Sequence, residues 1–169
     1  MKYIGIDIGD GESAVACLAE DSVIEPVIQP IDGRGSILSV VGMAGTEVRI
    51  GEKALLDRKV VHLRSRFKSR YLNTMDAERD IERFAHGLRT ALLEEADDFF
   101  DGDVYIAVGC PAGWKENDRA RYCEIMKRAG LGDVHIVSES RAAFFYARYA
   151  HELKVAPEHK SERVLYYMG

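Results

Sequence analysis

The order of apolar segments along the chain restricts its fold more than any other feature of the sequence. Three strand-like runs open the chain at residues 3–8, 13–18 and 23–29, and short polar links join them. Such links favour an antiparallel meander. Pro26 lies inside the third run and has no N–H to donate to a neighbouring strand, so we expect this strand at an edge of the sheet.

From residue 77 onward, helical and strand-like patterns alternate. The first helix is predicted over residues 77–97, because its apolar residues recur at intervals of three and four. These residues are Ile81, Phe84, Ala85, Leu88 and Leu92. The following segments are a strand at 103–109, a helix at 117–129, a strand at 133–138, a helix at 139–153 and a last strand within 162–169. A meander that leads into β-α-β units predicts an α/β fold, with a mixed five-stranded type of sheet and helices on both faces.

Two details of this half carry further expectations. In the helix at 117–129 we expect Ala120, Cys123 and Met126 to face the core and Gly130 to end the helix. The last strand-like run reaches the final residue, Gly169, and a buried strand needs neighbours and cover. We therefore expect this chain to be the front piece of a longer protein.

Residues from about 35 to 75 are expected to form a small β-rich insertion. Short strand-like runs at 36–43 and 47–51 flank a turn, and residues 51–61 fit a short helix. Residues 62–80 are polar and poorly periodic, so we predict a crossing over the surface. The basic residues of this region can hold phosphate or an acidic partner, but we favour a solvated face. They are Arg58, Lys59, Arg64, Arg66, Lys68 and Arg70.

The charge and the cysteines exclude several classes of protein. The 169 residues carry a net charge of -5, which argues against nucleic acid as the partner. No apolar run approaches the length of about 20 residues that spans a bilayer, and the N-terminus lacks the pattern of a signal peptide. Cys17, Cys110 and Cys123 show no paired spacing, which argues against a zinc site or a disulfide framework. We expect a cytoplasmic protein without a membrane partner.

The stretch YIGIDIGDG at residues 3–11 contains the residues that suggest binding chemistry. Glycines at the end of a strand allow backbone N–H groups to approach a phosphate, so Gly9, Asp10 and Gly11 are candidates for a phosphate-binding turn. Asp7 is a candidate ligand for Mg²⁺, which keeps part of its hydration shell. Glu139 follows the strand at 133–138 and can approach the same crevice. The alternatives are a packing role for the glycines, a structural role for Asp7 and a helix N-terminal role for Glu139.

Two sequence stretches resemble the DnaK-type chaperones, which belong to the superfamily of actin and the sugar kinases. The stretch IGIDIGDGESAVA at 4–16 is similar to the first phosphate motif of that family. The stretch at 104–147 is similar to the family pattern V-x-x-V-P-A-x-F-x-x-x-Q-R, A-G-L and I-x-N-E-P-T-A-A-A. The positions in register are Pro111, Ala112, Arg119, Ala129, Gly130, Leu131, Glu139, Ala142 and Ala143.

This resemblance implies a ribonuclease-H-like first lobe of an actin-like ATPase over residues 1–169, with the second lobe outside the chain. It implies ATP or ADP with Mg²⁺ as cofactors, Asp7 and Glu139 as catalytic residues, and Pro111 and Arg119 as residues that couple nucleotide state to substrate binding. It also implies client polypeptides and co-chaperones as partners of the longer protein. We expect the chain alone to be inactive and to bind nucleotide poorly, because half of the cleft is absent.

Several positions depart from the family pattern. Asp10 and Gly11 replace two hydroxyl residues, and an ionised Asp10 repels phosphate unless a cation lies between them. Leu55 stands where we place the catalytic lysine of the family, so Lys53 or Lys59 would have to replace it. Tyr167 stands where an acid is expected. These departures predict slow or absent hydrolysis.

Three other functions fit parts of the sequence. One is a scaffold with a nucleotide-binding fold that has lost hydrolysis, which the departures at Leu55 and Tyr167 favour. The second is an actin-like assembly protein, which shares the fold but not the long match at 104–147. The third is a nuclease in which Asp7 and Glu139 bind two metal ions, which the net negative charge disfavours.

Overall fold

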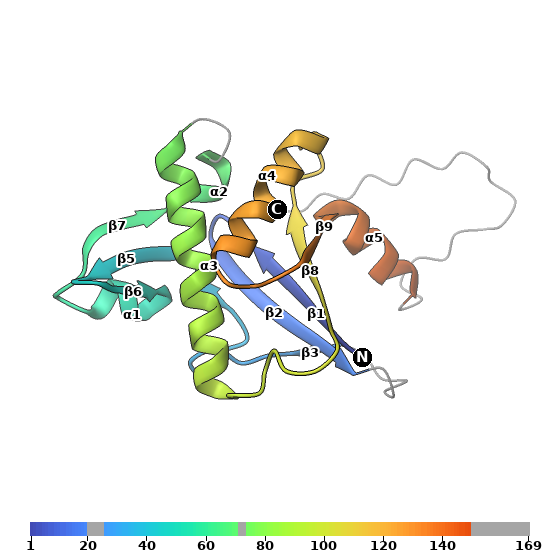
Figure 1. Ribbon diagram of the computed structural model, residues 1–169, viewed down its shortest axis with the longest axis horizontal. Coiled ribbons are helices and arrows are strands. Elements are labelled where there is room, and N and C mark those ends of the chain that lie inside the picture. The colour runs from blue at the N-terminus through green and yellow to red at the C-terminus, as the bar shows by residue number, and fades with distance from the viewer. Residues whose placement is uncertain (20–25, 71–73, 150–169) are drawn as a thin grey trace, which may run out of the picture.

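The computed structural model describes residues 1–19, 26–70 and 74–149. These residues form an α/β fold with one large mixed sheet, one small sheet and helices packed against them (Figure 1). The strand expected within 162–169, with Tyr167, lies outside the described residues. No helix in the described part of the chain is long and apolar enough to cross a membrane.

The large sheet has the strand order β3-β2-β1-β8-β9, with β4 paired to β2. Its strands are β1 (Lys2–Ile8), β2 (Glu12–Ala19), β3 (Val27–Ile28), β4 (Ile37–Leu38), β8 (Val104–Cys110) and β9 (Val134–Ser138). Strand β2 is antiparallel to β1 and β3, whereas β1, β8 and β9 are parallel. The predicted meander and the parallel units that follow it are therefore confirmed. Strand β3, which follows Pro26, lies at an edge as expected.

The small sheet comes from the expected insertion and has the order β6-β5-β7. Its strands are β5 (Val40–Ala44), β6 (Glu47–Ile50) and β7 (Val61–Ser65), and α1 (Gly51–Leu56) follows β6. The prediction of an irregular surface crossing over 62–80 is wrong, because β7 and α2 (Phe67–Arg70) lie there. All five residues of β7 are exposed, so the short alternation of Val61 and Leu63 with polar residues does not correspond to a buried face. Hydrogen bonds to β5 define it instead.

Helix α3 (Met75–Glu95) bridges the two sheets. It begins at the N-cap residue Thr74, whose side chain accepts a hydrogen bond from the Ala77 N–H at 3.2 Å. A Cβ atom on Gly87 would lie 2.5 Å from the Ile50 side chain, so the helix packs directly on β6. Ile81 and Leu88 share one hydrophobic core with residues of both sheets. The predicted inward face of this helix is therefore confirmed.

Helix α4 (Glu116–Arg128) packs beside α3, and α5 (Glu139–Tyr149) contacts β9. Tyr122, Ile125 and Met126 are the buried residues of α4, and Cys123 is half-buried. The prediction that Ala120 faces the core is wrong, since Ala120 is exposed. The buried residues of α4 begin at Tyr122, two positions later, and recur at intervals of three and four, so the buried face of the helix does not include Ala120.

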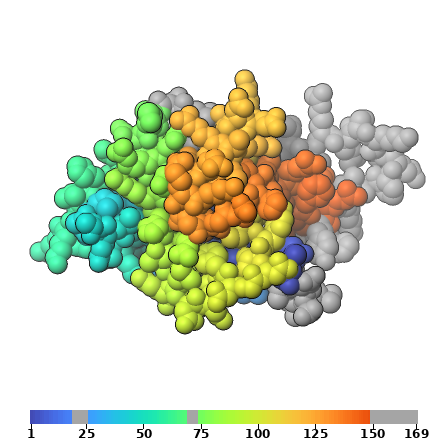
Figure 2. Space-filling view, in the orientation of Figure 1, coloured from blue at the N-terminus to red at the C-terminus, as the bar shows by residue number. Residues whose placement is uncertain are grey.

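The two faces of the large sheet differ in their cover. Ile4, Ile6 and Ile8 of β1 point to the buried face, which α3 and α4 hide from view in the space-filling picture (Figure 2). The alternate residues of β1, including Tyr3 and Asp7, point to the opposite face and are exposed. The expectation that helices also cover this second face of the large sheet stays a prediction.

Candidate functional site

Two acidic side chains meet at the carboxyl ends of the parallel strands. Asp7 lies near the end of β1, Gly109 near the end of β8, and Glu139 directly follows β9. A Cβ atom on Gly109 would lie 3.4 Å from Glu139 Oε1 and 3.5 Å from Asp7 Oδ1. The two carboxylates therefore approach the glycine from either side, at the edge of an α/β sheet where ligands usually bind. The structure brings together the two predicted catalytic acids.

A buried lysine lies between these acids. Lys68 is only 6% exposed, and its Nζ donates a hydrogen bond to the Gly109 carbonyl oxygen at 3.3 Å. The same ammonium forms an ion pair and hydrogen bond with Glu139 and lies 3.9 Å from Asp7 Oδ1. A lysine is almost never this buried unless it is paired. Its partners here are the predicted site residues.

The neighbouring residue Phe67 fixes Lys68 in this position. Helix α2 has only four residues and follows β7 after one intervening residue. Phe67 is 1% exposed, and its ring packs on the ring of Phe84 in α3 with 5.1 Å between centroids. Since Phe67 enters the core, the adjacent Lys68 is carried below the surface as well. An aromatic residue inside a polar run is the sequence signal that marks this segment as anchored.

The charges of the site favour a cation. The pKa of Asp7 is raised, chiefly because the carboxyl loses part of its water, while Lys68 lowers it and Glu139 raises it. Two carboxylates and one ammonium leave a formal charge of -1 before any ligand binds. Asp7 is 64% exposed in its side chain and can accept hydrogen bonds from metal-bound water. The donor set therefore fits Mg²⁺, which uses one or two carboxylates and keeps several waters.

A metal cage built by the protein alone is not found among the described residues. No group of three or more histidine, cysteine, aspartate or glutamate side chains in this part of the chain has the geometry to hold an ion. Any Mg²⁺ at Asp7 needs further ligands from water and phosphate oxygens.

The turn after β1 accepts only glycine at its first position. A Cβ atom on Gly9 would lie 2.4 Å from the Glu12 carbonyl oxygen, which also accepts the Gly9 N–H at 3.1 Å. The Gly11 carbonyl accepts the N–H of Ser39 at 2.8 Å, so the turn is tied to the segment between β4 and β5. A Cβ atom on Gly11 would meet nothing within 4 Å. The turn that carries Asp10 is therefore compact, and it follows Asp7 directly.

The predicted coupling residues lie near the end of β8. Burial raises the pKa of the Cys110 thiol, and Arg119 opposes this shift by its charge and a hydrogen bond. The charges of Glu139 and Lys68 also act on the pKa of this thiol. Pro111 follows Cys110, and its carbonyl accepts the Trp114 N–H at 3.2 Å. Arg119 and Pro111 thus border the site without contacting its acids directly.

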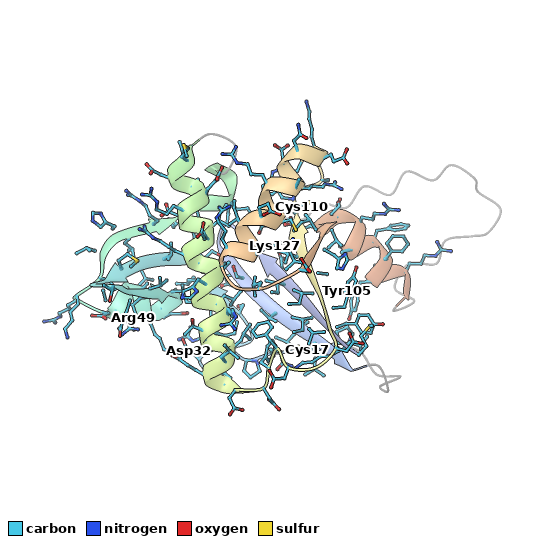
Figure 3. The ribbon with its side chains drawn as sticks, in the orientation of Figure 1. Cys17, Asp32, Arg49, Tyr105, Cys110 and Lys127 are labelled. Carbon is cyan, nitrogen blue, oxygen red and sulfur yellow. The ribbon has the colours of Figure 1, made fainter. Side chains whose placement is uncertain are left out.

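The lysine candidates from the sequence lie elsewhere. Lys53 pairs with Asp32 at 2.5 Å and with Glu94 at 3.6 Å. Figure 3 shows Asp32 near the lower end of α3 and Cys110 near the upper end of the large sheet, so the Lys53 pair is remote from the acids. Leu55 is exposed on α1, and Lys59 is exposed before β7. The cation beside the two acids is Lys68, which the sequence does not single out as a replacement for the lysine expected at Leu55, and slow or absent hydrolysis stays a prediction.

No protein-family model matches the sequence. The chain is similar to the chaperone protein DnaK of Thermosipho melanesiensis, with 27% identity over 149 residues. The match covers 83% of this chain and 25% of that protein, so the chain spans about a quarter of the length of the curated relative. This similarity suggests a distant relationship to DnaK, and the mixed sheet with its helices is compatible with one lobe of an actin-like ATPase.

Proposed function

We propose that this chain is the first lobe of a DnaK-like chaperone ATPase with a ribonuclease-H-like fold and provides half of its site for MgATP. The observation that carries the proposal is the buried ammonium of Lys68 between Asp7 and Glu139 at the ends of parallel strands. Two acids and a lysine beside a glycine turn are the groups that phosphoryl transfer requires. The distant similarity to DnaK supports the same function.

Each residue has a separate role in this proposal. The backbone of Gly9, Asp10 and Gly11 borders the phosphates, and Lys68 offsets charge on the transferring phosphoryl group. Glu139 orients the attacking water by accepting a hydrogen bond from it. Asp7 holds the waters of Mg²⁺, and the metal, when bound, neutralises charge on the phosphate oxygens. Asp10 lacks a hydroxyl to donate, so the turn relies on its backbone N–H groups.

The coupling role belongs to the residues beyond Gly109. Arg119 lowers the pKa of the thiol of Cys110, which follows Gly109, and the Gly109 carbonyl in turn accepts a hydrogen bond from Lys68. A change in ligand charge at Lys68 can thus be transmitted to Arg119 and Pro111 through one strand end. In the longer protein this path would link nucleotide state to the binding of client polypeptides and co-chaperones.

Steady-state ATP hydrolysis by the longer protein that carries this chain tests the proposal. Lys68→Met keeps the length of the side chain and removes its charge, so we expect hydrolysis to fall by about a hundredfold or more. Asp7→Ala should lower the rate and weaken its dependence on Mg²⁺ concentration. Lys53→Met is the matched control, since its pairs with Asp32 and Glu94 lie away from the acids.

Equal hydrolysis by the wild type and by the Lys68→Met and Asp7→Ala variants would refute the ATPase site. A wild-type protein that binds MgATP without measurable hydrolysis would instead support the scaffold with a nucleotide-binding fold. Polymerisation in light scattering would support the actin-like assembly protein.

A further inference from the structure

The segment that carries Lys68 is attached to α3 at two points. Arg64 of β7 lies 3.9 Å from Asp80 of α3, measured from Nε to Oδ2. The second point is the packing of Phe67 on Phe84. Asp80 and Phe84 are four residues apart, so they lie on the same side of α3 one turn from each other. Both contacts flank the short connection from β7 to Lys68.

Asp80 lies in a buried position, where an unpaired carboxylate would destabilise the fold. It is 8% exposed and has ion pairs with Arg64 and with Arg83 of the same helix at 3.8 Å. Burial raises the pKa of Asp80, and the attraction of Arg64 and Arg83 does not cancel that rise. A carboxylate in this situation adds little to the stability of the fold. Its position is better explained by its ion pair with Arg64, which holds β7 on α3.

A helix-dipole role does not account for Asp80. The effect of the dipole falls off within the first turn of a helix. The first turn of α3 already contains Asp76 and Glu78, and Asp80 follows it. Its side chain is directed at Arg64 of a different element, which joins the small sheet to the helix.

We propose that Asp80 is a positioning residue for Lys68: with Phe84, it holds the β7–α2 segment on α3 and thereby keeps the ammonium between Asp7 and Glu139. The small sheet is then part of the machinery that sets the charge of the site. The catalytic consequence rests on the proposed function, whereas the position of Lys68 can be measured without nucleotide.

Chemical labelling of lysines in the folded chain measures this position. Brief acetylation with sulfo-N-hydroxysuccinimide acetate, followed by peptide mass spectrometry, gives the reactivity of Lys68 relative to the exposed Lys59. We expect Asp80→Asn and Arg64→Gln each to raise the relative reactivity of Lys68 by about two- to fivefold, the range of a partly exposed ion pair. The double variant should show no more than either single one, because the two residues act through one contact.

Arg83→Gln is the matched control. It removes the other ion pair of Asp80, which lies within α3, and leaves β7 attached. The reactivity of Lys68 should stay at the wild-type level in this variant, and the urea midpoint of all four variants should stay close to that of the wild type.

Unchanged reactivity of Lys68 in both Asp80→Asn and Arg64→Gln would overturn the proposal. An equal rise of that reactivity in Arg83→Gln would overturn it as well. Arg64 is half exposed, so its variant tests the contact even if Asp80→Asn fails to fold. The labelling result also separates the two proposals. Should Lys68→Met hydrolyse ATP normally while Asp80→Asn exposes Lys68, the proposed function falls and the positioning role stands.

Discussion

Replacing Lys68 by methionine should destabilise the fold in a way that depends on pH. Methionine keeps most of the volume of the buried side chain and removes the ammonium. Asp7 and Glu139 then face each other without the cation that separates them. A Cβ atom on Gly109 would lie 3.4 Å from Glu139 Oε1 and 3.5 Å from Asp7 Oδ1. These two carboxylate oxygens are therefore at most about 7 Å apart.

The size of the effect follows from these positions. Two like charges about 7 Å apart repel by about 0.6 kcal/mol in water and about 2.4 kcal/mol at the effective dielectric constant of about 20 found near protein surfaces. Loss of the Glu139 pair adds to this, but the side chains of Glu139 and Asp7 are 25% and 64% exposed, so water screens the acids. We expect a loss of about 1 to 3 kcal/mol in the free energy of unfolding at neutral pH, below the range of about 3 to 5 kcal/mol for fully buried pairs.

The direction of the pH dependence follows from Asp7. Its pKa in the folded wild type is raised, so ionisation of Asp7 weakens the fold as the pH rises above its ordinary value. Lys68 is the group that lowers this pKa, and its removal raises the pKa further. The cost of Lys68→Met is therefore largest at neutral pH, where Asp7 is ionised, and it shrinks in acid as the pH falls through the raised pKa of Asp7 and the carboxylate takes up its proton.

Urea unfolding followed by tryptophan fluorescence measures this loss. Trp114 is the single tryptophan of the chain and is buried against Tyr122, so it reports on the native state. Lys53→Met is the control. Because Lys53 is half exposed, we expect this variant to lose at most about 1 kcal/mol in the free energy of unfolding, with little difference between neutral and acidic pH. A Lys68→Met variant as stable as the wild type at neutral pH would refute the reasoning. So would a variant that loses the same free energy of unfolding at neutral and at acidic pH.

Three glycines of the site give further predictions. Gly9→Ala should cost about 1 to 3 kcal/mol in urea unfolding, because its Cβ would lie 2.4 Å from the Glu12 carbonyl oxygen, whereas Gly11→Ala should be close to neutral since its Cβ meets nothing within 4 Å. Equal costs for these two variants would contradict the geometry of the turn. Gly109→Ala should leave the unfolding free energy within about 1 kcal/mol of the wild type, but it should lower ATP hydrolysis by the longer protein about tenfold, because its Cβ would lie 3.0 Å from Glu139 Cγ and displace that carboxylate. Wild-type hydrolysis by Gly109→Ala would show that the position of Glu139 does not matter to the rate.

The antiparallel meander and the parallel units of the large sheet could be predicted from the sequence because their signals are local. Short polar links mark the meander, and the apolar spacing at Ile81, Phe84 and Leu88 marks the helix that covers the sheet. The parallel arrangement of β1, β8 and β9 follows from the helices between them. That arrangement was enough to predict that Asp7 and Glu139 meet at one edge.

The buried position of Lys68 between the acids could not be predicted in this way. Residues 61–66 are all exposed, and the alternation of Val61 and Leu63 with polar residues is too short to stand out from the polar run that follows. The basic residues around Lys68 reinforce this impression, and Arg58, Lys59 and Arg66 are indeed exposed. Lys68 differs from them because its neighbour Phe67 is buried against Phe84, a contact between residues far apart in the sequence. The same limit applies to Ala120, whose exposure depends on where α4 meets its neighbours.

The site takes its charges from two parts of the fold, and this links its chemistry to the packing between them. The large sheet supplies the acids, and the segment after β7 supplies the cation. A lysine leaves water only if its surroundings repay the loss, so Lys68 needs both the acids and the contacts that hold Phe67 on α3. With Lys68 in place the site has a formal charge of -1, which attracts a divalent cation and lets a phosphate follow it. Without Lys68 the charge is -2, and the phosphate meets stronger repulsion. Under the proposed function, a movement of β7 along α3 would therefore change the affinity for nucleotide although no acidic residue moves.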